Sequence, residues 1–124
     1  MGRKPFLASG KILGDYSVLI KYFEICMSKG GECMDLFPSR EVLDDIKEMA
    51  ENKGYSYLDV LGEIRVRIED KIDCDIAVEA YKMVHGISVS CEDARMELLK
   101  EIVAWYLEAA ETLGLVKLKE SWKP

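Results

Sequence analysis

The stretch from Glu63 to Ala80 constrains the fold of this chain most strongly, because its residues alternate between apolar and charged. Every even position except Asp70 is apolar, and every odd position except Ala77 is charged. Alternation with a period of two is typical of a β-strand that buries one face, whereas an α-helix would distribute the same residues around its circumference. The segments on either side have helical periodicity, so this stretch decides the fold class.

The choice between strand and helix depends on Val66. On a helix, Val66 would point about 200° away from Ile64 and forfeit roughly 1.5 to 3 kcal/mol of burial. A strand over residues 63–69 would bury all of its apolar side chains together. Beyond residue 71 helical spacing fits as well, so we favour a strand followed by a helix. A continuous helix and a β-hairpin that turns at residues 69–71 are the alternatives.

Four principal helices are predicted from apolar periodicity and from helix start and stop signals. They cover about residues 16–28, 40–53, 72–85 and 91–113. The expected N-caps are Asp15, Ser39, Asp73 or Asp75, and Ser90, and glycines 30, 54, 86 and 114 end the helices. The sequence therefore predicts a mainly α fold of two helical hairpins, with a minor β-ribbon around residues 63–69.

Three shorter segments are less defined by their patterns. Ser56 and Asp59 match a capping box, but the β-branched and aromatic residues around them also suit a strand. Residues 1–8 are expected to form a short strand or an ordered arm. The tail from residue 116 is expected to add an edge strand or to fray.

The length predicts a single domain over residues 1–124. Within it, KILGDYSV from Lys11 is similar to KIDCDIAV from Lys71, and EVLDDI from Glu41 is similar to ELLKEI from Glu97. These similarities indicate two pseudo-repeats, about 11–54 and 71–114, joined by residues 55–70. The alternative is that two amphipathic hairpins resemble each other by pattern alone.

Composition and charge exclude several protein classes. No apolar run reaches the roughly 18 residues of a membrane span, and the N-terminal sequence lacks the apolar core of a secretory signal. We therefore expect a cytoplasmic protein that does not associate with membranes. The net charge of −6 argues against binding a polyanion over the whole surface. The four cysteines are then expected to be reduced thiols.

The sequence IRVRIE followed by two helices resembles the ribbon-helix-helix family of DNA-binding proteins. In that family paired strands place alternate side chains in the major groove, so the resemblance implies that Arg65 and Arg67 contact DNA. The sequence can also be aligned with this family in a second way, in which REVLDDIKEMAENKGYS is similar to the family's helices. The two alignments exclude each other, because the second makes residues 64–68 helical. The alternative is that both arginines pair with Glu63, Glu69 or other helix carboxylates.

Metal binding and catalysis have little support in the sequence. Cys26 and Cys33 are too far apart for a CxxC pair, and Cys74, His85 and Cys91 are scattered. His85 fits the role of a cationic residue at a helix C-terminus. No carboxylate, serine or glycine motif of a known catalytic type is present. We therefore expect neither an enzyme nor a bound cofactor or metal.

The remaining expectation is a protein interaction. Trp105 and Tyr106 are adjacent on the last helix and point about 100° apart, and that helix is apolar over much of its circumference. The two residues are candidates for an interaction surface, and a buried core helix in a monomer is the alternative. The sequence thus predicts a small non-catalytic interaction or regulatory subunit, as a homodimer or with a protein partner. A DNA-binding regulator that uses Arg65 and Arg67 is the second hypothesis.

Overall fold

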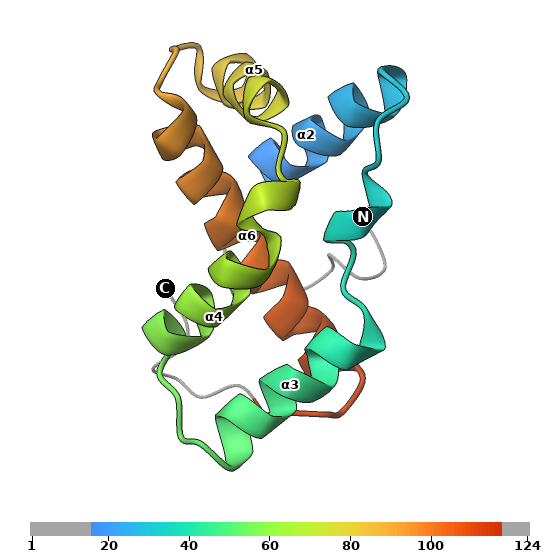
Figure 1. Cartoon of the computed structure of the whole chain (residues 1–124), viewed down its shortest axis with the longest axis vertical. Helices are drawn as coiled ribbons and strands as arrows, with labels where there is room; N and C mark the ends of the chain where they lie inside the picture. The colour runs from blue at the N-terminus through green and yellow to red at the C-terminus, as the bar shows by residue number, and fades with distance from the viewer. Residues whose placement is uncertain (1–15, 118–124) are drawn as a thin grey trace, which may run out of the picture.

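The computed structural model describes residues 16–117, and within this range the chain is mainly helical and contains no strand (Figure 1). It has five α-helices and two short 3₁₀ turns: α2 (Ser17–Ser28), η1 (Met34–Leu36), α3 (Arg40–Glu51), α4 (Tyr57–Ile68), η2 (Glu69–Lys71), α5 (Cys74–His85) and α6 (Cys91–Thr112). The mainly helical fold is confirmed, and the predicted number of principal helices rises from four to five. The predicted arm at residues 1–8, the cap at Asp15 and the tail from residue 118 lie outside the described residues.

Local sequence signals account for where most helices begin. The side chains of Ser39, Ser56, Asp73 and Ser90 each accept a hydrogen bond from a backbone N–H in the first turn of α3, α4, α5 and α6, at 3.1 to 3.2 Å. At Ser56 the capping box with Asp59 is complete. These contacts satisfy N–H groups that have no partner within the helix. The predicted caps at Ser39 and Ser90 are therefore confirmed, and of the two alternatives for α5, Asp73 and Asp75, the cap is Asp73.

The predicted ends of α5 and α6 are confirmed as well. Gly86 follows α5 with φ of +79°, a left-handed conformation that glycine adopts without a steric penalty. After α6 the N–H of Leu115 donates to the carbonyl of Ala110 at 2.9 Å, next to Gly114 with φ of +77°. This is the Schellman arrangement that the sequence predicts there.

The predicted β-ribbon is wrong, because residues 57–68 form α4. The helix buries one stripe, in which Val60 and Ile64 are 0% exposed and Ile68 is 3% exposed. Val66 lies outside that stripe and is 82% exposed. The complete capping box and four buried apolar side chains stabilise the helix, although Val66 remains in solvent.

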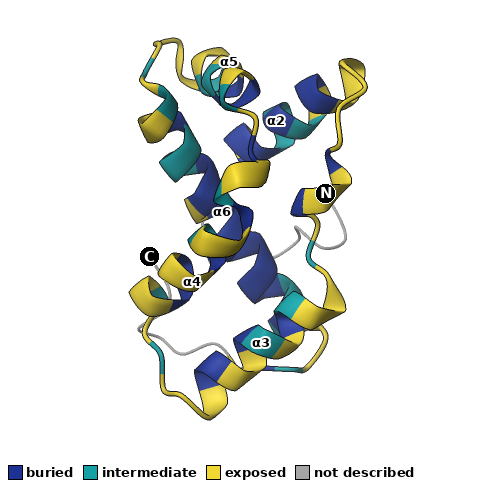
Figure 2. Ribbon diagram, viewed as in Figure 1, coloured by how far each residue is buried: buried dark blue, intermediate teal, exposed yellow. Residues whose placement is uncertain are grey.

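Helix α6 runs through the middle of the described structure and packs against each of the other four α-helices (Figure 1). Figure 2 shows the middle of α6 in the dark blue of buried residues, whereas its first turns are partly exposed. Helix α2 makes its most extensive contact with α5, which is distant in sequence, whereas α3 packs against α6. The first predicted hairpin, formed by α2 and α3, is therefore not confirmed, and the proposed repeat stays a prediction.

The second predicted hairpin is corrected by the positions of two cysteines. The Cα atoms of Cys74 and Cys91, the first residues of α5 and α6, are only 5.5 Å apart. Helix α5 has 12 residues and is about 18 Å long, so residues 86–90 return the chain to the start of α5. The two helices begin side by side, whereas in a hairpin the end of one lies beside the start of the next.

The cysteines form two disulfides, which corrects the prediction of reduced thiols. Cys26 pairs with Cys33, with a Cα–Cα distance of 6.1 Å, and Cys74 pairs with Cys91. The first disulfide joins the end of α2 to the loop before η1, and the second joins the starts of α5 and α6. Sequence spacing alone does not reveal which cysteines the fold brings together.

Within residues 16–117 no helix is long and apolar enough to cross a membrane. The cytoplasmic location stays a prediction, and two disulfides are more typical of proteins in oxidising compartments.

Candidate functional site

Arg65 and Arg67 lie in the last turns of α4, and the structure pairs both with carboxylates. Arg65 donates to Glu69, the first residue of η2, and lies 3.6 Å from a carboxylate oxygen of Glu92 on α6. Arg67 bridges to Asp45 on α3. The hydrogen bond from Arg65 holds the pKa of Glu69 below its usual value, and the same bond raises the pKa of Arg65. The ribbon on which the DNA-binding hypothesis depended is absent, and this pairing matches the alternative interpretation of the two arginines.

Trp105 and Tyr106 are buried within the single chain, with exposed fractions of 3% and 1%. The Tyr106 hydroxyl donates to the carbonyl of Leu36 at 2.6 Å, which holds η1 against α6. Burial raises the pKa of Tyr106. The ring of Trp105 packs edge-on against Phe23 and Phe37, with centroid distances of 5.8 and 5.1 Å. An interaction at this position would therefore have to use the surface beside Trp105.

An apolar groove of about 380 Å³ lies beside Trp105, between the start of α3 and the last turns of α6. Its lining is almost entirely apolar: Phe37, Pro38, Leu43, Trp105, Ala109, Thr112 and Leu113. Phe37 is 41% exposed and Leu113 is 57% exposed, so both rims of the groove present large apolar side chains to solvent. An aromatic floor with exposed apolar rims is typical of a surface that binds an apolar side chain of a protein.

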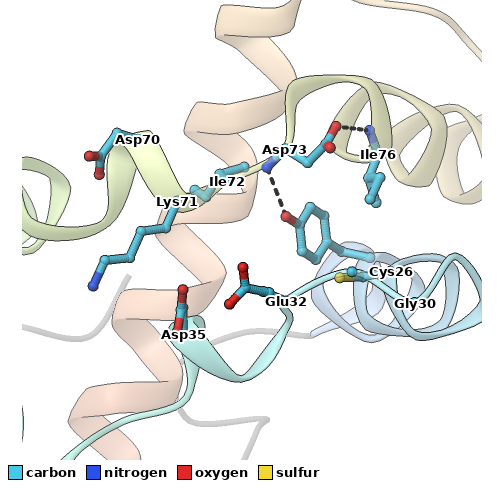
Figure 3. A pocket seen from close by; sticks show the side chains of 11 residues that line it. Cys26, Gly30, Glu32, Asp35, Asp70, Lys71, Ile72, Asp73 and Ile76 are labelled. Atoms are coloured by element: carbon cyan, nitrogen blue, oxygen red, sulfur yellow. Dashed lines mark hydrogen bonds between the residues drawn. The ribbon is translucent and has the colours of Figure 1, made fainter.

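A second, polar hollow of about 520 Å³ lies between the end of α2 and the connection from η2 to α5 (Figure 3). The Tyr22 hydroxyl there accepts a hydrogen bond from the N–H of Asp73 at 2.8 Å, and the Asp73 carboxylate accepts from the N–H of Ile76 at 3.1 Å. These bonds fix the start of α5 against α2. The side chains of Glu32 and Asp35 lie on the opposite wall (Figure 3).

The ionisable side chains that line the polar hollow are four carboxylates, Lys71 and Tyr22. The described residues that line it include no histidine and no serine, and its cysteine, Cys26, is in a disulfide. Across residues 16–117 no group of three or more histidine, cysteine, aspartate or glutamate side chains is placed to hold a metal ion. The apolar groove is therefore the better candidate site.

Two buried carboxylates on α6 were not anticipated from the sequence. Glu101 is 6% exposed and accepts a hydrogen bond from the N–H of Leu19 in the first turn of α2, at 2.8 Å. Glu108 is 2% exposed and accepts from the Tyr16 hydroxyl at 3.2 Å. Burial and the Glu108 carboxylate raise the pKa of Tyr16. The spacing of seven residues between Glu101 and Glu108, on an otherwise apolar helix face, was the signal available in the sequence. The contacts of both carboxylates indicate that they position the start of α2.

No family model, curated protein or solved structure matches this chain.

Proposed function

We propose that this chain is a non-catalytic interaction subunit that binds an amphipathic helix of a partner protein in the groove beside Trp105. The observation that carries the proposal is the lining of the groove, where a fixed indole ring forms the floor and Phe37 and Leu113 form exposed apolar rims. Buried aromatic anchors of this kind contribute a large share of binding energy at protein interfaces.

The chemistry of the partner follows from the shape and charge of the chain. The groove runs between α3 and α6, and a groove between two helices accepts the apolar face of a third helix through residues spaced three and four apart. The chain carries a net charge of −6. A partner helix with lysine and arginine on its polar face would therefore associate faster and with better charge complementarity.

A peptide-display selection on the full chain tests this proposal. Random peptides should yield binders with large apolar residues at helical spacing and basic residues between them. Leu113→Asp should weaken the binding of these peptides at least about tenfold, because it places a charge on the rim of the groove. Fluorescence anisotropy with labelled peptides measures the change.

Met83→Asp is the matched control. Met83 is also 57% exposed, and it lies on α5 at the opposite end of the described structure from the groove (Figure 1). This variant introduces the same charge at an equally exposed apolar position and should leave peptide binding within about twofold of the wild type. A selection that enriches no peptide, or peptides that bind Leu113→Asp as well as the wild type, would refute the groove as the binding site.

A further inference from the structure

The outward face of α4 is apolar and uncovered within the described residues. Leu58 and Val66 are 72% and 82% exposed, and Gly62 lies midway between them and is also exposed. The three residues are spaced by four along the helix and therefore share one side of it. Few of the described positions expose large apolar side chains so fully, so this face resembles one side of a helix–helix contact.

Nothing among residues 16–117 explains the glycine at the centre of this face. Gly62 lies inside α4 without a positive φ, and a Cβ atom added there would meet no atom within 4 Å. A glycine inside a helix lowers helix stability relative to alanine, so an alanine would suit the isolated chain better. Because glycine has no Cβ atom, another backbone can approach an exposed helix closely at this position.

We propose that a second copy of this chain packs its α4 antiparallel against α4 across a two-fold axis at Gly62. In such a symmetric contact each residue meets the residue at the mirrored distance from the axis. Leu58, four positions before Gly62, then lies opposite the partner's Val66. Asp59, three positions before Gly62, lies opposite the partner's Arg65, and each of these contacts occurs twice.

A hollow beside Val66 completes the match with a second copy. It measures about 400 Å³ and is lined by Arg65, Val66, Glu69, Asp70 and Arg95. Four of these five residues are charged, so the exposed Leu58 of the other copy would contact the hollow through Val66. Leu58 meets Val66 and Asp59 meets Arg65 in the same register, while Asp59 and Arg65 keep their partners within the chain, Ser56 and Glu69. This self-complementarity favours a second copy of this chain over an unrelated partner.

The contact is small, because it consists mainly of one helix from each copy. Specific, stable interfaces bury about 800 Å² on each partner, and a single pair of 12-residue helices buries less. The dimer is therefore expected to be reversible, with a dissociation constant in the micromolar range. It does not depend on the groove beside Trp105, which lies on other helices.

Sedimentation equilibrium of the full chain over a range of concentrations tests the dimer. The wild type should show a reversible monomer–dimer equilibrium, and Val66→Asp should raise the dissociation constant at least about tenfold, because the new charge would be buried. Met83→Asp and Leu113→Asp are matched controls at exposed apolar positions outside α4 and should associate as the wild type does. A wild type that stays monomeric at millimolar concentration would overturn the proposal, as would a Val66→Asp dimer of unchanged affinity.

Gly62→Ala separates this packing from a general effect on folding. The alanine should raise the melting temperature of the dilute monomer by a few degrees, because its Cβ meets open space and favours the helix. The same methyl group should push the two helices apart and raise the dissociation constant at least about tenfold. If the variant is more stable and dimerises as well as the wild type, the glycine-centred contact is refuted. Peptide binding in the groove is a separate measurement, so failure of one proposal leaves the other intact.

Discussion

Reduction of the two disulfides is expected to lower the free energy of unfolding by about 5.5 kcal/mol. In the chain-entropy model a disulfide removes about 2.1 + 1.5R ln n cal/mol/K from the unfolded chain, where n is the length of the closed loop. For Cys74–Cys91 the sequence separation is 17, which corresponds to about 3.1 kcal/mol at 25 °C. For Cys26–Cys33 the separation is 7, which corresponds to about 2.4 kcal/mol. Small proteins have total free energies of unfolding of about 5 to 15 kcal/mol. Reduction would therefore remove a large share of the stability of this protein.

Urea unfolding with and without a phosphine reductant measures this loss. Tryptophan fluorescence is a suitable signal, because Trp105 is buried against Phe23 and Phe37 and becomes exposed on unfolding. The reduced protein should unfold at lower urea concentration. Its unfolded chain is less constrained and exposes more surface, so the dependence of the free energy on urea should also become steeper. Intact-mass measurement confirms that both disulfides are reduced.

Paired replacements separate the two disulfides. Cys74→Ser with Cys91→Ser should cost about 3 kcal/mol, since both residues are half-buried and serine adds little further penalty. Cys26→Ala with Cys33→Ala removes the shorter loop and also some buried volume. An unchanged urea midpoint after complete reduction would refute the reasoning. So would four reactive thiols in protein that was unfolded without reductant.

Three further predictions concern single side chains and pH. Tyr106→Phe should lower the free energy of unfolding by about 1 to 2 kcal/mol in urea titrations, because it leaves the Leu36 carbonyl without its donor. Burial raises the pKa of Tyr106 and Tyr16, so their contribution is complete below about pH 10, where the unfolded chain stays protonated, and is lost at higher pH. The part of the tyrosinate absorbance that disappears in Tyr16→Phe and Tyr106→Phe variants should therefore rise together with loss of helical circular dichroism. Gly86→Ala should lower the free energy of unfolding by about 1 kcal/mol, because φ at Gly86 is +79°. Gly62→Ala should raise it by about 0.5 to 1 kcal/mol, because the added Cβ meets open space. Equal melting temperatures for the two variants would contradict this expectation.

The starts of α3, α5 and α6 and the ends of α5 and α6 could be predicted because their causes are local. A serine or aspartate at Ser39, Asp73 and Ser90 reaches an N–H group three residues later, and a glycine at Gly86 adopts a conformation that other residues avoid. These interactions involve neighbours in sequence, so they are visible without the fold. The mainly helical class follows from them and from the apolar periodicity.

The candidate site could be predicted only in part. The sequence singled out Trp105 and Tyr106 as candidates for an interaction surface, with burial in the core as the alternative. Both are buried, and Trp105 lies at the floor of a groove whose other wall comes from Phe37 and α3. The positions of Phe37 and Leu113 beside it depend on how α3 packs against α6. The opposite rim therefore could not be found from the spacing of residues on either helix alone.

By itself the sequence determined where α3, α5 and α6 begin, because each cap joins residues three apart. Only the tertiary structure decided the state of residues 63–69, where alternation favours a strand but packing of Ile64 and Ile68 against the core favours α4, with Val66 left in solvent. It also decided the pairing of the cysteines, because contacts between distant segments depend on the arrangement of all the helices. The physical difference lies in range: hydrogen bonds at helix ends act between neighbours, whereas burial and pairing require the whole fold.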